Sequence, residues 1–169
     1  MLKSLGGDMK KPFIILSLLL SLSMATVTDI DGNVYGTVQI GEQLWMAENL
    51  KVTHYNNGDE IPNLTNNSDW MSTSSGAYSD YDNDPANSDT YGRLYNGYTV
   101  DDSRGICPVD YHVPNYSEYI ELTDFLGGNS IAGGKMKETG TSHWVSPNVG
   151  ATNESGFTAL GGGYRHFNG

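Results

Sequence analysis

The chain has 169 residues, which is enough for one domain with a single core. Lysine and arginine number 9 against 20 aspartates and glutamates, so the formal net charge is −11. A surface this acidic repels nucleic acid and anionic lipid, and we predict no nucleic-acid partner. Divalent cations and neutral ligands remain compatible with it, as does plain solubility without any ligand.

The first 25 residues have the pattern of a signal peptide. Lys10 and Lys11 precede an apolar run over residues 13–22, and Ser23-Met24-Ala25 supplies small residues for cleavage. The run is shorter than the roughly 20 residues that cross a bilayer. We therefore predict export, with Met9 as an alternative start and no membrane span after cleavage. The remaining domain is residues 26–169, and the loss of three lysines and one aspartate takes its net charge to −13.

Residues 27–52 are predicted to form antiparallel strands. Asp31-Gly32 reads as a tight hairpin turn, whose central positions favour positive φ. Val34, Val38 and Ile40 alternate, so they are expected on one buried face of a strand. Gly41-Glu42 suits a second two-residue turn with glycine in the strained first position.

The strand after this second turn, Leu44-Trp45-Met46-Ala47, is expected to be mostly buried. Trp45 offers a ligand platform in principle. Inside an alternating strand, however, a tryptophan more often belongs to the core, and this is our prediction.

The middle of the chain, residues 55–90, is rich in Asn, Asp, Ser and Gly and is predicted to be a long irregular loop. Asp80, Asp82 and Asp84 alternate within it, and oxygen-rich loops of this kind can bind Ca²⁺. Pro85 and Tyr91 exclude an EF-hand, because they replace its turn glycine and closing glutamate. The alternative is a solvated acidic loop without metal.

Aromatic side chains are the candidate ligand contacts, because sugars are held by aromatic faces together with amides and carboxylates. The candidates are Trp70, Tyr78, Tyr81, Tyr95 and Tyr98. The alternative is that they pack beneath the long loop.

A helix is predicted after Asn115, which suits the N-cap, with Glu118 three residues later as the capping-box partner. Tyr119, Leu122 and Leu126 share its apolar face, and Gly127-Gly128 ends it. The sequence shows no convincing catalytic constellation. The four histidines are too far apart for an HxH or HExxH zinc motif: His54, His112, His143 and His166.

Several motifs occur in the order typical of one family of secreted bacterial modules. They are Tyr91-Gly92-Arg93-Leu94-Tyr95-Asn96, Cys107-Pro108, His112-Val113-Pro114, Gly134 to Gly140 and Ala151 to Phe157. In this order the chain resembles the Fibrobacter succinogenes major paralogous domain family over about residues 27–169. It departs from the family at Gly97, Asp110, Tyr111 and Gly161.

The resemblance implies an α+β fold of the C-type-lectin-like kind shared with formylglycine-generating enzymes. Such a fold has small twisted antiparallel sheets, one or two helices and long loops that carry any function. The formylglycine-generating relatives need two cysteines at their active site, whereas this chain has one.

Cys107 is that single cysteine, and an odd cysteine in a secreted protein indicates a partner elsewhere. The resemblance implies a second cysteine near the end of the domain. We therefore expect that residues 1–169 are a fragment and that Cys107 pairs with a cysteine beyond residue 169. The alternative is a short protein with a buried free thiol.

These observations predict a secreted or surface-bound module that binds a carbohydrate or a protein without catalysis. Calcium is the only cofactor considered, and the oligomeric state is open. The alternatives are an extracellular enzyme acting on polysaccharide and a structural or adhesion protein.

Overall fold

The computed structural model describes residues 25–168, so the predicted signal peptide, apart from Ala25, lies outside the described residues. The strands are β1 (Thr26–Thr28), β2 (Val34–Ile40), β3 (Gln43–Met46), β4 (Tyr78–Ser79) and β5 (Leu94–Tyr95). The helices are α1 (Asn67–Ser72), α2 (Ser88–Tyr91), α3 (Gly97–Val100), α4 (Tyr116–Phe125) and α5 (Asn129–Met136), with 3-10 turns η1 (Tyr81–Asn83) and η2 (Pro85–Asn87). The α+β class is confirmed, although the described residues form more helices than the one or two expected.

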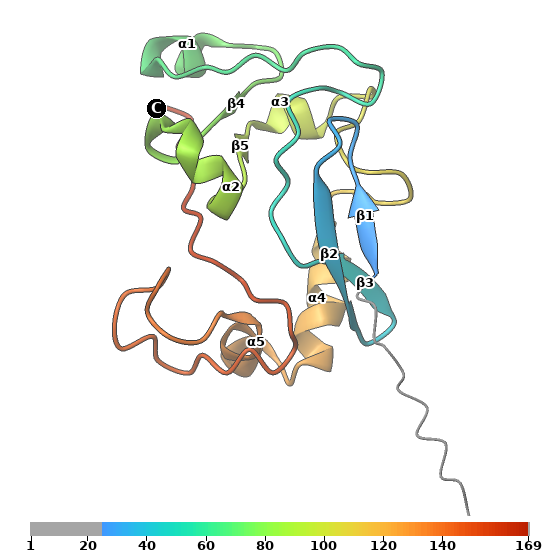
Figure 1. The fold of residues 1–169 in the computed structure, drawn as a ribbon, viewed down its shortest axis with the longest axis vertical. Coiled ribbons are helices and arrows are strands. Elements are labelled where there is room, and N and C mark those ends of the chain that lie inside the picture. Colours follow the sequence, from blue (N-terminus) through green and yellow to red (C-terminus); the bar gives the residue numbers. More distant parts are fainter. Residues whose placement is uncertain (1–24, 169) are drawn as a thin grey trace, which may run out of the picture.

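β1, β2 and β3 form an antiparallel sheet in that order, and β4 pairs with β5 in a separate two-stranded ribbon (Figure 1). Ile40 pairs directly with Gln43, so the predicted two-residue turn at Gly41-Glu42 is confirmed. Gly41 has a φ of 60°, which glycine adopts without the steric cost of a side chain.

The turn predicted at Asp31-Gly32 is different: the loop between β1 and β2 is longer than two residues. Thr28 pairs with Val34, and of the two predicted turn residues only Gly32 has positive φ. The Asp29 carboxylate organises the loop by accepting hydrogen bonds from the backbone N–H of Asp31 (3.0 Å) and from the hydroxyl of Tyr35 (2.6 Å). A buried carboxylate thus replaces the backbone geometry of a tight turn.

Two expectations of burial in these strands were wrong. Val34 is 56% exposed, and the buried residues at that end of β2 are Tyr35 and Thr37, on the opposite parity. β3 is only partly buried: Leu44 is 49% exposed, because it lies on the face opposite Trp45, where its partner Gln39 on β2 is exposed as well.

The core consists of two apolar clusters. The first joins the sheet to α4 and α5 through Ile40, Leu122, Leu126 and Ala132. The second lies beneath the loops and comprises Val52, Tyr55, Ile61 and Ile106. In Figure 1 the strands of this sheet run between the region around α4 and the region around α3. The segment after β3 therefore connects the two clusters.

α4 begins as the sequence predicts. The Asn115 side chain accepts from the backbone N–H groups of Ser117 and Glu118, and Glu118 accepts in return from the Asn115 N–H. Leu122 and Leu126 face the core, as expected. Tyr119 does not: it is 49% exposed, because it lies near the start of the helix beside a hollow rather than beneath the sheet.

The long middle loop packs back on the body, and the C-terminal segment fixes one end of it. Trp70 of α1 is buried, and its indole N–H donates to the carbonyl of His166 (3.0 Å). The Arg165 guanidinium lies 4.6 Å from the ring centre of Trp70 and donates to the Leu64 carbonyl (2.6 Å) and the Asn67 side chain (2.9 Å). Figure 1 shows this segment rising from α5 to end beside α1 and α2.

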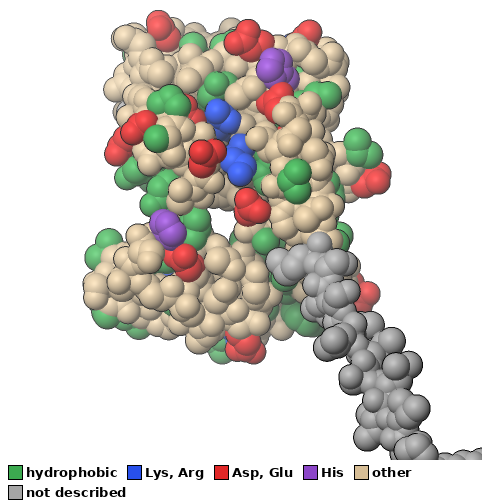
Figure 2. All heavy atoms as spheres, in the orientation of Figure 1, with side chains coloured by type: hydrophobic (Ala, Val, Ile, Leu, Met, Phe, Trp, Pro, Cys, Tyr) green, Lys and Arg blue, Asp and Glu red, His purple; other side chains and the backbone are tan. Residues whose placement is uncertain are grey.

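On the face drawn in Figure 2, acidic side chains are spread over both halves of the molecule, whereas basic side chains gather over the upper half. Over residues 25–168, no helix has the length and apolar character that a bilayer crossing requires.

Arg165→Ala is expected to lower the free energy of unfolding by about 1.5–3 kcal/mol, because hydrogen bonds from a charged donor are lost and their acceptors are left half-buried. The matched control is Lys135→Ala, which removes an ion pair with the exposed Glu154 (3.2 Å) and should cost less than about 1 kcal/mol. Urea denaturation measures both. Equal losses would show that Arg165 does not anchor the C-terminal segment.

Candidate functional site

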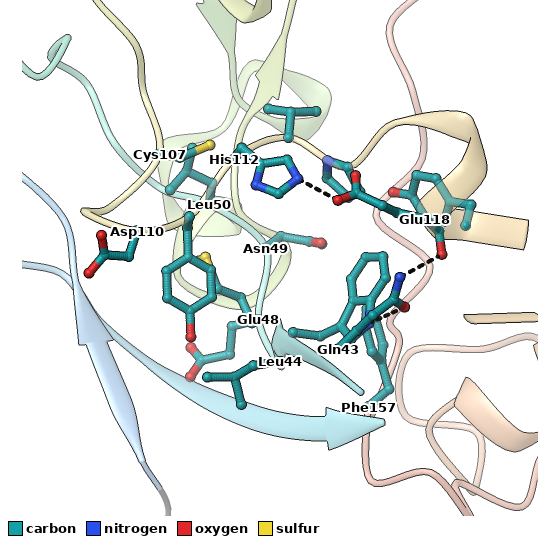
Figure 3. A pocket seen from close by; sticks show the side chains of 16 residues that line it. Gln43, Leu44, Glu48, Asn49, Leu50, Cys107, Asp110, His112, Glu118 and Phe157 are labelled. Carbon is teal, nitrogen blue, oxygen red and sulfur yellow. Dashed lines mark hydrogen bonds and ion pairs between the residues drawn. The ribbon is translucent and has the colours of Figure 1, made fainter. Parts of the chain in front are cut away.

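A pocket of about 370 Å³ lies where the two clusters meet. One wall is β3 with the segment that follows it, Glu48 to Leu50. The opposite wall is the segment 107–114, the beginning of α4 and Phe157. Figure 3 shows these side chains arranged around the hollow.

Aromatic rings form the floor of the pocket. The ring of Trp45 lies 5.6 Å from that of Tyr119 and 6.1 Å from that of Phe157, measured between centres. Trp45 also packs against the first cluster, so the prediction that it belongs to the core is correct for one side of the ring. Its indole N–H donates to the Gln43 side chain (3.2 Å), which fixes the ring beside the pocket.

The polar groups of the pocket centre on Glu118. One carboxylate oxygen accepts from the Asn115 N–H (2.8 Å), and the other lies 2.7 Å from His112 Nε2 (Figure 3). The Asn115 hydrogen bond, followed by that with His112, holds the pKa of Glu118 below its usual value. Gln43 donates to the backbone carbonyl of the same residue (3.2 Å), which joins β3 to α4. Glu118 is therefore an ionised acceptor rather than a proton donor.

A second hollow, of about 560 Å³, lies on the other side of the segment 107–114. Cys107 lines both hollows and packs against the second cluster. Burial raises the pKa of its thiol. It forms no disulfide within residues 25–168, and its pairing with a cysteine beyond residue 169 stays a prediction.

None of the five aromatic residues singled out from the sequence lines the pocket. Trp70 is buried under Arg165, and Tyr78 pairs with Tyr95 across the β4–β5 ribbon, 6.3 Å between ring centres. Tyr81 is 39% exposed beside another tyrosine ring, and Tyr98 of α3 is 55% exposed. The structure therefore gives three of these side chains packing roles and leaves Tyr81 and Tyr98 on the surface.

The three aspartates of the acidic loop have different surroundings. Asp80 is buried, 3.3 Å from Arg93 Nε, although the angle between these groups is poor for a hydrogen bond. Asp84 accepts from the Ala86 N–H (3.0 Å) and Asp82 is exposed. Within the range 25–168, no three His, Cys, Asp or Glu side chains are grouped as metal ligands. Calcium binding by this loop stays a prediction.

Sequence reasoning missed the pocket because its aromatic residues looked like core residues. Trp45 and Tyr119 both occupy positions with core periodicity. No local signal separates the half-exposed ring of Tyr119 from a core ring, because its surroundings come from β3 and other segments distant in sequence.

Glu118→Gln should weaken the pH dependence of stability. Because the pKa of Glu118 is lowered in the folded state, its ionised form stabilises the fold above the unfolded pKa, and this contribution is lost as the pH falls through the folded value. We expect wild type to be more stable than the variant at neutral pH, with the difference shrinking below about pH 4.5. Urea unfolding over this range measures it.

The control for this experiment is Glu121→Gln. Glu121 is exposed on the same helix, and its side chain forms no hydrogen bond within the described part of the chain. It should follow wild type at each pH. A constant difference between Glu118→Gln and wild type would contradict the assignment.

A family model described as the Fibrobacter succinogenes major domain matches residues 38–169. No curated protein and no solved structure matches the chain. Because no solved structure matches, the C-type-lectin-like fold relationship stays a prediction. The family match is different, because the matched range includes most of the chain. The chain belongs to the Fibrobacter succinogenes major domain family.

Proposed function

We propose that the chain is an exported binding module without catalytic activity and that the pocket beside β3 holds its ligand. The supporting observation is the group of aromatic rings, Trp45, Tyr119 and Phe157, around a pocket of about 370 Å³. Ligand pockets commonly have volumes of about 300–1,000 Å³ and combine apolar walls with a few fixed polar groups.

The polar rim suits a ligand that donates hydrogen bonds. Glu48, Asp110 and Glu118 contribute carboxylates, and Asn49 contributes an amide. A carbohydrate or a segment of an extracellular protein offers donors of this kind together with surface that packs on aromatic rings. A carbohydrate and a protein segment are therefore both compatible with a non-catalytic binding function.

The alternative of polysaccharide hydrolysis needs a carboxyl group that is protonated near neutral pH, alongside an ionised partner. The lowered pKa of Glu118 argues against its serving as that acid. An adhesion protein is compatible with the proposal, because adhesion is one use of a binding module.

Tyr119→Ala should weaken ligand binding about tenfold or more, because a half-exposed ring in the pocket is removed. The control is Tyr98→Ala, which removes a tyrosine of similar exposure (55% against 49%) outside the pocket and should leave binding unchanged. Glycan and peptide arrays identify the ligand, and titration calorimetry compares the two variants.

The same ligand, incubated with the protein, should be recovered intact. Equal affinities of the two variants would contradict the assignment of the pocket, and release of product would contradict a function without catalysis.

A further inference from the structure

In the part of the chain that the structure describes, the outer edge of β3 presents unpaired backbone groups. Ala47 N–H donates to the Gly36 carbonyl, so Gly36 and Ala47 are a hydrogen-bonded pair of the β2–β3 ladder. Hydrogen-bonded pairs alternate along antiparallel strands, so Gln43 and Trp45 also face β2. The N–H and C=O groups of Leu44 and Met46 must then point away from the sheet.

Outside the ladder with β2, Leu44 and Met46 make no backbone hydrogen bond to another residue within 25–168. Both residues line the pocket, and Leu44 is about half exposed. The pocket therefore lies along an open strand edge. Such an edge is a template for an added strand, because each of its backbone groups lacks only a partner.

We propose that the ligand of this pocket is an extended, cationic polypeptide segment of a partner protein, which pairs with β3 as a fourth strand of the sheet. This inference rests on the proposed function and names the ligand class. Backbone hydrogen bonds to Leu44 and Met46 hold the segment along β3, and alternate apolar side chains enter the pocket towards Trp45 and Tyr119.

Charge argues against a second copy of this chain as the added strand. In an antiparallel pairing of two β3 edges around Trp45, Glu42 of one copy would lie opposite Glu48 of the other. Like charges directly opposite one another on paired strands are destabilising. The net charge of −11 adds repulsion between copies at longer range.

The same carboxylates favour basic residues in the partner. Glu48 is shared with Lys51 (3.6 Å), and Glu118 is shared with His112. Asp110 on the pocket wall and Glu42 at the end of β3 have no ion-pair partner among the described side chains. A segment with an apolar centre and lysine or arginine at its ends therefore matches the edge.

The test uses the blocked peptide Lys-Thr-Val-Thr-Val-Thr-Lys and an analogue that is N-methylated on its interior amides. The two share their side chains, but only the first can donate to β3. We expect the first to bind and the second to bind at least about tenfold more weakly. A version with glutamate at both ends should also bind about tenfold or more weakly. Equal binding of the N-methylated analogue would overturn strand pairing.

Leu44→Pro tests the protein side of the same contact. Proline removes an N–H that points away from β2, so the β2–β3 ladder stays intact, as in edge strands that contain proline. Peptide binding should fall about tenfold or more. Leu44→Val retains the N–H and should bind the peptide at least about tenfold more tightly than Leu44→Pro does. Urea denaturation of all three proteins checks that they fold.

The outcomes separate this inference from the proposed function. If a glycan binds with sensitivity to Tyr119→Ala and the peptide does not bind, the pocket is a binding site and the strand proposal is wrong. If the peptide binds and Leu44→Pro, shown to be folded, binds it like wild type, strand pairing is also overturned. If neither ligand class binds in the pocket, both proposals fall.

Discussion

The packing of α4 against the β2–β3 hairpin is the constraint on which the pocket depends. Leu122 and Leu126 bury against Ile40, and each buried aliphatic side chain contributes about 1.5–3 kcal/mol to this contact. The capping box at the start of the helix fixes where its first turn lies. That turn carries Glu118 and Tyr119, so the contact that stabilises the helix also sets one wall of the pocket opposite β3.

The other wall depends on the second cluster. Ile106 is buried beside Val52, and the segment 107–114 continues from it along the pocket. Arg104 holds the chain just before this segment: it pairs with Asp102 and Asp59, and its guanidinium lies 3.7 Å from the ring centre of Tyr55. The two packed regions thus form a hollow between them, and within residues 25–168 no strand pairs with the edge at its margin.

Local signals in the sequence predict the regular parts of this fold. Asn115 with Glu118, and Gly41 in its turn, specify backbone geometry through neighbours a few residues away, and the structure confirms both. The Asp29 loop was missed because its carboxylate, besides its local bond to the Asp31 N–H, accepts from the hydroxyl of Tyr35, a contact that no turn motif encodes. The pocket was missed for a related reason: whether a ring such as Tyr119 is covered depends on segments distant in sequence. Composition identifies aromatic residues that could contact a ligand, but it does not show which side chains surround them in the fold.

Hydrogen exchange at the backbone amides of Leu44 and Met46 tests the central claim most directly. These amides point away from β2, so in the free protein they should exchange readily despite lying in a strand. Saturation with the cationic peptide should slow both, because a paired strand supplies their acceptors, while the amides of Gln43 and Trp45 should already be protected. Unchanged exchange at Leu44 and Met46 while the peptide is bound would contradict the account.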